Sequence, residues 1–355
     1  MAEHNGGLRL LIVRMSSLGD VVHALPAITD AAQAHPLLRV DWLVEESFAE
    51  IPRWHHAVDR VIPVKLRHWR KHPIEALTSS IRKAAWHILK TTRYDAIVDV
   101  QGLLKSAWLT SKAQGPKHGY DWSSAREPLA SMFYNQRHTV AKGSHAITRV
   151  RELLSKALQY PVPAGPLNFG LTVPTPTHNP VAPISDAPYL IFFHGTTWVT
   201  KEWPVDFWRQ LIAIAGQAGR VVYLPWGNPR EQARAHALAH GFSHAVVLPA
   251  LKLSALAYLI QQGQGVVTVD TGLGHIAGAL NVPVVSLYGA TDPQLTGIQG
   301  RYQHTLASNF SCAPCKKKQC HWNQAVPPCY EVLTPKRVWA QLERLWITQA
   351  QEAHV

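Results

Sequence analysis

Asp270, Thr271 and His275 lie in a stretch that could bind an anion, Gly265 to Leu280, which reads GVVTVDTGLGHIAGAL. Its valines form a β-branched run typical of a buried strand, and a helical apolar pattern resumes at His275. The two glycines between them allow a tight turn and leave no side chain in the way of a ligand. Unpaired amides and the positive end of a helix dipole would meet here, which makes the turn a candidate cradle for a phosphate or diphosphate. The pattern also fits an ordinary strand–turn–helix connection, so the rest of the chain must decide.

Two turns earlier in the chain carry polar side chains of a related kind. The first follows the apolar run Tyr189–Phe193 and contains Thr196, Thr197 and Lys201, whose hydroxyls and ammonium can converge on a diphosphate. The second contains Glu231, which at the end of a strand can bind the hydroxyls of a ribose. Each also has an ordinary interpretation, because lysines are common in solvated loops and glutamate is favoured in the first turn of any helix.

A carboxylate, Asp20, follows the first apolar run of the chain in the turn that contains Ser17 and Gly19. A carboxylate at this place can act as a general base and take a proton from an acceptor hydroxyl. It can equally cap the helix that begins here, and the turn by itself favours capping.

Basic residues gather in the segment KLRHWRKH, residues 65–72, which includes Arg67 and Arg70. With its tryptophan this run suits an anionic acceptor or a lipid headgroup, although most charge runs are solvated surface. Arg126 either belongs to the same region or pairs with its neighbour Glu127.

The elements that position these turns alternate between short apolar strands and helices, which predicts parallel sheets covered by helices on both faces. We expect strands at residues 8–13, 40–44, 61–64 and 96–100, and then at 189–193, 221–224, 246–248, 266–269 and 284–287, the last of which should end its sheet. The fold class is therefore α/β, with two doubly wound, Rossmann-like domains that face a cleft and bind ligands at the carboxyl ends of their strands.

The domain boundaries follow from the prolines. Residues 1–160 form the first domain, and residues 161–188, which hold eight prolines, form a linker, since proline breaks helices and central strands. Residues 189–334 form the second domain. A terminal helix at 335–355, with Pro335 in its first turn, is expected to pack back toward the N-terminal domain.

The composition narrows the choice of partners. A chain of 355 residues suits two domains, and a net charge of +12 calls for nucleic acid, an anionic membrane surface or a phosphorylated substrate. No nucleic-acid-binding motif is present, whereas thirteen tryptophans among many basic residues suit a lipid headgroup layer. No apolar run reaches the roughly 20 residues of a membrane span or forms a signal peptide, so we expect a cytoplasmic protein.

The chain's four cysteines lie in one segment with the spacing C-x2-C-x4-C-x8-C: Cys312, Cys315, Cys320 and Cys329. A reducing cytoplasm disfavours disulfides, so zinc is one hypothesis for this segment. The spacing is not that of a standard zinc ribbon, and reduced thiols with a local packing role are the alternative.

Taken together, several blocks of the chain resemble the bacterial lipopolysaccharide heptosyltransferases, from about Leu8 to Pro293. They are MSSLGDVVHALPAITD, DVQGLLKSAWL, KHGYDWSSAREPLASMFYN, TTWVTKEWP, LPWGNPREQARA and VVTVDTGLGHIAGAL with the following YGATDP. The first and third most resemble the heptosyltransferase I branch, which adds the first heptose to Kdo-lipid A. The resemblance implies a GT-B glycosyltransferase fold, an ADP-heptose donor, inversion at the anomeric carbon, no metal or other cofactor, and a peripheral position on the cytoplasmic face of the inner membrane.

The resemblance also assigns roles by position. Asp20 matches the proposed base, with Ser17 and Gly19 beside it on the acceptor side, and Arg67, Arg70 and Arg126 fall in the region of the Kdo acceptor. The donor-binding matches are Thr196, Thr197 and Lys201 for the diphosphate and heptose, Glu231 for the ribose, Leu251 for the adenine, and Asp270, Thr271, Gly272 and His275 for the donor loop. Gly274 replaces a common serine, and the cysteine segment with its Lys316–Lys318 run looks more like the tails of heptosyltransferases II and III.

The expected mechanism has Asp20 deprotonate an acceptor hydroxyl while Lys201 and the donor turns stabilise the departing diphosphate. The alternatives are a heptosyltransferase II or III that acts on an already heptosylated core, an epimerase of sugar nucleotides on the same architecture, and a basic protein that binds lipid or nucleic acid without catalysis.

Overall fold

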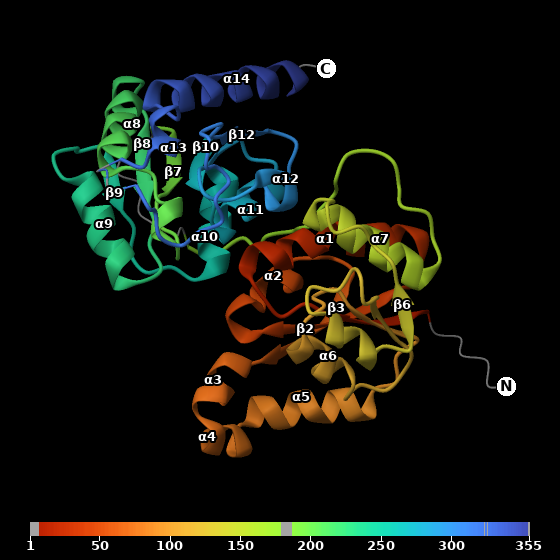
Figure 1. Ribbon diagram of the computed structural model, residues 1–355. Coiled ribbons are helices and arrows are strands. Elements are labelled where there is room, and N and C mark those ends of the chain that lie inside the picture. Colours follow the sequence, from red (N-terminus) through yellow and green to blue (C-terminus); the bar gives the residue numbers. More distant parts are fainter. Residues whose placement is uncertain (1–6, 179–186, 323, 325, 354–355) are drawn as a thin grey trace. The chain divides into compact units, whose positions relative to one another are not determined.

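The apolar runs of the sequence form two six-stranded sheets, one in each of two units of the chain (Figure 1). The structure is a computed structural model that describes residues 7–178, 187–322, 324 and 326–353. Unit 1 is Met1–Thr172 and unit 2 is Val173–Val355, so the boundary falls inside the proline-rich stretch. The amide of Thr172 donates to the carbonyl of Trp54 at 2.7 Å, which ties the start of this stretch to unit 1. Residues 179–186 of the stretch lie outside the described residues.

The sheet of unit 1 has the strand order β3-β2-β1-β4-β5-β6, with all neighbouring strands parallel. Its centre, β1 (Arg9–Val13) and β4 (Ala96–Asp99), is almost wholly apolar and buried, as expected for strands covered on both faces. The other strands are β2 (Arg39–Glu45), β3 (Val58–Val64), β5 (Lys117–Tyr120) and β6 (Gln136–His138).

Helices cover both faces of this sheet (Figure 1). On one face α1 (Leu18–Ala34) packs against α7 (Ala146–Leu158). On the other, α5 (Ser80–Thr91) contributes Ala85 and Leu89 to a core with Leu11 and Val13. The remaining helices are α2 (Glu50–Arg53), α3 (Leu66–Lys71), α4 (Pro73–Thr78) and α6 (Leu104–Thr110).

The sheet of unit 2 repeats the topology of unit 1. Its order is β12-β11-β10-β7-β8-β9, which is the same order once the strands are numbered within the unit. The strands are β7 (Tyr189–Phe193), β8 (Val221–Leu224), β9 (Ala245–Val247), β10 (Gly265–Val269), β11 (Val284–Tyr288) and β12 (Gln303–Ala307). Each sheet therefore reverses its direction of growth once, between β1 and β4 and between β7 and β10, and ligands of doubly wound folds bind at such points.

The helices of unit 2 also lie on both faces of their sheet. Trp208 and Leu211 of α8 (Val205–Gln217) and Leu238 of α9 (Pro229–Ala239) share a core with the strands. On the opposite face, α11 (Gly272–Ala279) packs against β10 and α10 (Leu253–Gln262). The short helices are α12 (Pro293–Thr296) and α13 (Pro328–Glu331).

The terminal helix, α14 (Pro335–Ala353), belongs to unit 2, and its expected packing back toward the N-terminal domain stays a prediction. It packs against α8, β11 and β12. Its apolar stripe explains this, because Val338 and Leu342 are fully buried in the same core as Trp208.

Three strands were not expected from the sequence: β5, β6 and β12. The prediction that residues 284–287 end their sheet is wrong, because β12 pairs with β11 from Val284↔Gln303 to Tyr288↔Ala307. These strands were missed because β5 (KHGY), β6 (QRH) and most of β12 (QHTLA) do not show the apolar runs of buried strands. None of the helices in the described residues has the length and apolar character needed to cross a bilayer.

Candidate functional site

The turn after β7 places two hydroxyls and an ammonium at the carboxyl edge of the unit 2 sheet. Thr196 is buried, and its hydroxyl donates to the carbonyl of Asp270 at 3.2 Å, which links this turn to the end of β10. Thr197 is exposed beside it. A single 3₁₀ turn, Val199–Lys201, then brings the Lys201 side chain back toward the strand ends.

Lys201 is held by a carboxylate from the neighbouring strand end. Its ammonium lies 2.7 Å from Asp270 Oδ2, and the same oxygen accepts a hydrogen bond from the Thr291 hydroxyl at 2.6 Å. Both charged side chains are largely buried. The pair fixes a cation at the point between β7 and β10 where the sheet reverses its direction of growth.

The turn after β10 continues into α11, whose N-cap residue is Thr271. The amide of Gly274 donates to the carbonyl of Thr271 at 3.2 Å. The first two amides of the helix, those of Gly272 and Leu273, have no partner within it, so they and the helix dipole are available to an anion. Gly272 begins the helix and His275 is buried on it.

We expected Gly274 to leave space for a ligand, but its neighbours are side chains of the protein. A Cβ at this position would lie 2.6 Å from Ile298 and 2.8 Å from Thr268. This glycine lets the helix pack closely on β10.

Glu231 lies between two strand ends. Its carboxylate accepts from the amide of Gly227 at 2.8 Å, and its own amide donates to Asn228, the N-cap of α9, at 3.0 Å. A Cβ on Gly195 would lie 2.6 Å from the Glu231 carboxyl carbon. The carboxylate therefore rests against the turn after β7 as well as the turn after β8, and both the helix-capping interpretation and the ribose interpretation fit its position.

Leu251 lines an open cavity of about 370 Å³ on the β9 side of the sheet. Pro174, Thr175 and Pro176 form one wall of it, and Ala250 and Ala255 lie next to Leu251 on the other. The wall is mostly apolar, as a pocket for an aromatic base requires.

In unit 1, Asp20 is the third residue of α1 and forms a capping box with Ser17, the N-cap residue, so it helps to cap the helix as the turn favoured. The amide and hydroxyl of Ser17 both donate to Asp20 Oδ2 at 2.8 Å, and Arg14 lies 2.6 Å from Asp20 Oδ1. Burial opposes the charge, but the Arg14 guanidinium and the Ser17 hydrogen bonds outweigh it and hold the pKa of Asp20 well below its ordinary value. Gly19 is buried in the first turn of α1.

The three basic residues expected at the acceptor side, Arg67, Arg70 and Arg126, follow carboxyl ends of strands in the unit 1 sheet. Arg67 and Arg70 are exposed on α3, which follows β3, and the Arg67 amide is capped by Glu45 at 3.2 Å. Arg126 is exposed beside the turn after β4. The sequence left open a pairing of Arg126 with its neighbour Glu127. In the structure the Glu127 carboxylate accepts a hydrogen bond from the amide of Leu104 at 2.6 Å instead.

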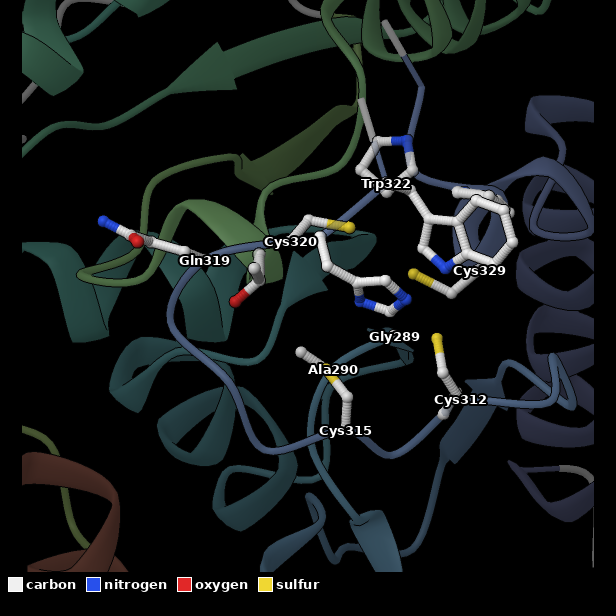
Figure 2. Close-up of a pocket in the computed structure, with 13 residues that line it drawn as sticks. Gly289, Ala290, Cys312, Cys315, Gln319, Cys320, Trp322 and Cys329 are labelled. Atoms are coloured by element: carbon white, nitrogen blue, oxygen red, sulfur yellow. The ribbon is translucent and has the colours of Figure 1, made fainter. Parts of the chain in front are cut away.

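The four cysteines line one small cavity of unit 2, of about 20 Å³ (Figure 2). Cys312, Cys320 and Cys329 direct their sulfur atoms toward it. Burial, with the neighbouring cysteine sulfurs, raises the pKa of Cys329 to about 11, which keeps this thiol protonated. Within the described residues, no three His, Cys, Asp or Glu side chains are arranged to hold a metal ion.

Two contributors to the site were missed from the sequence. Thr291 stands in the YGATDP block, but it is 21 residues from Asp270, and only the adjacency of β10 and β11 brings them together. Arg14 is the last residue before the Asp20 turn, and its role as ion-pair partner has no signal in the spacing.

Comparison with known proteins places this geometry in a family. The model of glycosyltransferase family 9 (heptosyltransferase) matches residues 82–326. Lipopolysaccharide heptosyltransferase 1 of Pseudomonas aeruginosa is 47% identical over 356 residues, which cover 95% of this chain and 98% of that protein.

Two solved structures of the Escherichia coli heptosyltransferase WaaC are similar throughout the chain. The one with ADP has a TM-score of 0.83 at 42% identity and covers 95% of this chain and 100% of that one. The one with ADP-2-deoxy-2-fluoro heptose has a TM-score of 0.79 at 42% identity, with 95% and 99% covered. With its two doubly wound units and this degree of identity, the chain belongs to glycosyltransferase family 9, the heptosyltransferases.

Proposed function

We propose that this enzyme transfers heptose from ADP-L-glycero-D-manno-heptose to a Kdo residue of Kdo-lipid A during synthesis of the lipopolysaccharide inner core. The observation that carries the proposal is the Lys201–Asp270 pair between β7 and β10, with the start of α11, where the amides of Gly272 and Leu273 have no partner within the helix, following Asp270 directly in the chain. The similarity to lipopolysaccharide heptosyltransferase 1 of Pseudomonas aeruginosa supports the choice of reaction. The WaaC structure with ADP-2-deoxy-2-fluoro heptose supports the choice of donor.

We propose that the donor lies along the carboxyl edge of the unit 2 sheet, with its parts at successive strand ends. We assign the diphosphate to Thr196, Thr197, Lys201 and the amides that follow Thr271, where β7 and β10 are neighbours. Glu231, at the next pair of strands, takes the ribose hydroxyls. The cavity beside Leu251 then takes the adenine. Neighbouring strands are about 4.8 Å apart, so the step from β10 across β7 and β8 to β9 spans about 14 Å, which suits an extended nucleoside diphosphate.

In the proposed reaction Asp20 takes the proton from the Kdo hydroxyl as its oxygen bonds to the anomeric carbon. The bond from that carbon to the diphosphate breaks on the opposite face, so the configuration inverts and ADP leaves with the electron pair. Arg14 keeps Asp20 ionised and fixes its orientation. The acceptor's anionic groups are assigned to Arg67, Arg70 and Arg126, with Ser17 and Gly19 lining the approach to the base.

Negative charge builds on the leaving diphosphate, and the proposal gives its stabilisation to groups that are already in place. Lys201 is oriented by its ion pair with Asp270. Fixed donors of this kind are worth several kcal/mol in a site that excludes water, so they can serve without a metal ion. We accordingly propose that transfer needs no cofactor, and that an excess of chelator leaves the rate unchanged. A rate that falls with EDTA and returns with added zinc would instead support a zinc site at the cysteines.

The acceptor is the part of the proposal that a single experiment can decide. Purified enzyme is incubated with ADP-heptose and either Kdo-lipid A or its mono-heptosylated product, and ADP release is followed. Release only with Kdo-lipid A supports the proposal. Release only with the heptosylated acceptor supports the heptosyltransferase II alternative, and the cysteine segment is the feature that favours it. Salt-dependent binding to lipid or nucleic acid without ADP release would support a non-catalytic basic protein.

We further propose that the enzyme works at the cytoplasmic face of the inner membrane and rests on its anionic lipids. Residues 65–90 hold seven Lys or Arg side chains and one acidic residue, Glu75. Within this segment, α4 exposes Ile74 and Leu77 to 81% and 66% of their surfaces. Apolar side chains inside a basic rim suit a headgroup layer.

The test of this surface is flotation with vesicles that contain anionic lipid. The wild type should float at low salt, and Ile74→Ser with Leu77→Ser should weaken flotation without loss of ADP release on detergent-dispersed acceptor. Leu37→Ser is the matched control, because Leu37 is 74% exposed outside this segment. Equal flotation of all three proteins would contradict the proposed surface.

A further inference from the structure

Trp198, in the turn after β7, has two ammonium groups against its ring. Lys201 Nζ lies 4.6 Å from the ring centroid and Lys318 Nζ lies 5.6 Å from it. Lys201 belongs to the proposed diphosphate site, whereas Lys318 comes from the cysteine segment more than a hundred residues later in the chain. The ring therefore brings a second cation to the edge of the donor site.

The loop that carries Lys318 is tied to the donor turns on both sides. The Thr200 hydroxyl donates to the carbonyl of Lys317 at 2.6 Å, and the amide of Lys316 donates to the carbonyl of Ala290 at 2.7 Å. The latter carbonyl immediately precedes Thr291, the partner of Asp270. Figure 2 shows the residues on either side of this loop, Cys315, Gln319 and Cys320, around the cavity next to Ala290. The position of Lys318 thus follows from contacts with both strand ends.

The charge balance around these lysines leaves room for an anion. Lys201 is neutralised by Asp270 at 2.7 Å. In the part of the chain that the structure describes, the Lys318 ammonium contacts the electron-rich face of the Trp198 ring. Such a contact stabilises an ammonium only partly, so the positive charge of Lys318 is not compensated by it. A diphosphate carries more negative charge than Lys201 alone can balance when Asp270 is its neighbour.

We propose that Lys318 is a donor-binding residue, which the cysteine-lined loop presents and Trp198 steers, and that it contacts the β-phosphate of ADP-heptose and of ADP. The proposal rests on the proposed function, because it takes the diphosphate to lie at Lys201. The proposal also gives the cysteine segment a function in this chain, because this segment carries Lys318. Its four cysteines line the cavity at the base of the loop: Cys312, Cys315, Cys320 and Cys329.

The test is calorimetric titration of the full chain with ADP and with AMP, which lacks the β-phosphate. Lys318→Ala should weaken ADP binding about five- to tenfold, the effect expected of one charge-assisted contact from an exposed side chain, and should change AMP binding less than twofold. Lys318→Arg should keep the affinity for ADP within about threefold of the wild type, because it retains the charge. Lys316→Ala, which removes the same charge from an exposed side chain of the same loop, is the control and should bind ADP as the wild type does.

The outcomes separate this inference from the proposed function. If Lys318→Ala binds ADP as tightly as the wild type while Lys201→Ala binds it weakly, Lys318 is not a donor-binding residue and the proposed donor site stands. If Lys318→Ala weakens AMP and ADP equally, the loop acts on the shape of the site and the β-phosphate contact is wrong. If the wild type binds no ADP, the proposed function fails together with this inference.

Discussion

Replacing Asp20 by Asn tests the proposed base with little change in shape. Asn keeps a side-chain oxygen that can accept from the Ser17 amide, so the cap of α1 survives in part. It removes the charge that faces Arg14 at 2.6 Å, where the Arg14 and Asp20 side chains are only 10% and 24% exposed. Leaving this guanidinium unpaired should cost about 1–3 kcal/mol of folding free energy, which urea unfolding can measure.

The effect on the reaction should be larger than the effect on folding. A general base contributes about 10²–10⁴ to a rate, so kcat of Asp20→Asn should fall by at least two orders of magnitude, with the KM for ADP-heptose changed little. The assay is ADP release with Kdo-lipid A at saturating donor. Asp59→Asn, at an exposed carboxylate of β3, is the control and should keep the wild-type kcat.

The pH dependence of this variant has a definite sign. The pKa of Asp20 in the folded protein lies below its ordinary value of 3.8, so its contribution to stability is complete above that value and is lost as the pH falls through the lower folded pKa. The difference in unfolding free energy between wild type and Asp20→Asn should therefore be constant from pH 5 to 8 and shrink below about 4. A kcat within tenfold of the wild type, with the variant folded, would refute the assignment of Asp20 as the base.

Three further changes concern unit 2. Lys201→Ala should lower kcat by about 10²–10³, because it removes a fixed donor to the leaving group, and steady-state rates with saturating donor measure this; an unchanged kcat with a raised KM would restrict Lys201 to binding. Gly195→Ala should weaken ADP binding about tenfold by displacing the Glu231 carboxylate, and calorimetry should show a much smaller effect of the same change in a Glu231→Ala background. Burial, together with Arg234, lowers the pKa of His194 to about 4, so unit 2 should lose up to about 3 kcal/mol as the pH falls from 6.5 toward 4; His194→Gln should flatten the pH dependence of urea unfolding, and parallel curves would contradict this.

Most of the fold could be predicted because strands of a buried parallel sheet have nearly continuous apolar sequences. β1 and β10 are examples, and the polar residues after them mark the sheet edge at which a site forms. The edge strands β6 and β12 could not be recognised, because their side chains are mainly polar and their identity depends on the pairing partner. A strand of this kind is fixed by tertiary contacts rather than by its own pattern.

The candidate site was predictable to a similar extent. Asp270 follows its strand directly, and Thr196, Lys201 and Glu231 lie within eight residues of a strand end. The structure places all four at the same edge of the unit 2 sheet. The pairing of Lys201 with Asp270 was not predicted, because it depends on β10 lying beside β7 although they are far apart in the sequence.

The shared strand order of the two units has a consequence for the hydrogen exchange of their backbone amides. In each sheet the strand before the key turn is central: β1 lies between β2 and β4, and β10 lies between β7 and β11. The amides of such strands are protected by two partners and by helices on both faces, so they should exchange with deuterium only on unfolding of their unit. The turns after them, with Asp20 and Thr271, lie at the sheet edge, beyond the residues that pair with neighbouring strands. Each unit thus joins its slowest-exchanging backbone directly to a turn that is proposed to contact substrate, and ligand binding should slow exchange in the turns far more than in the strands before them.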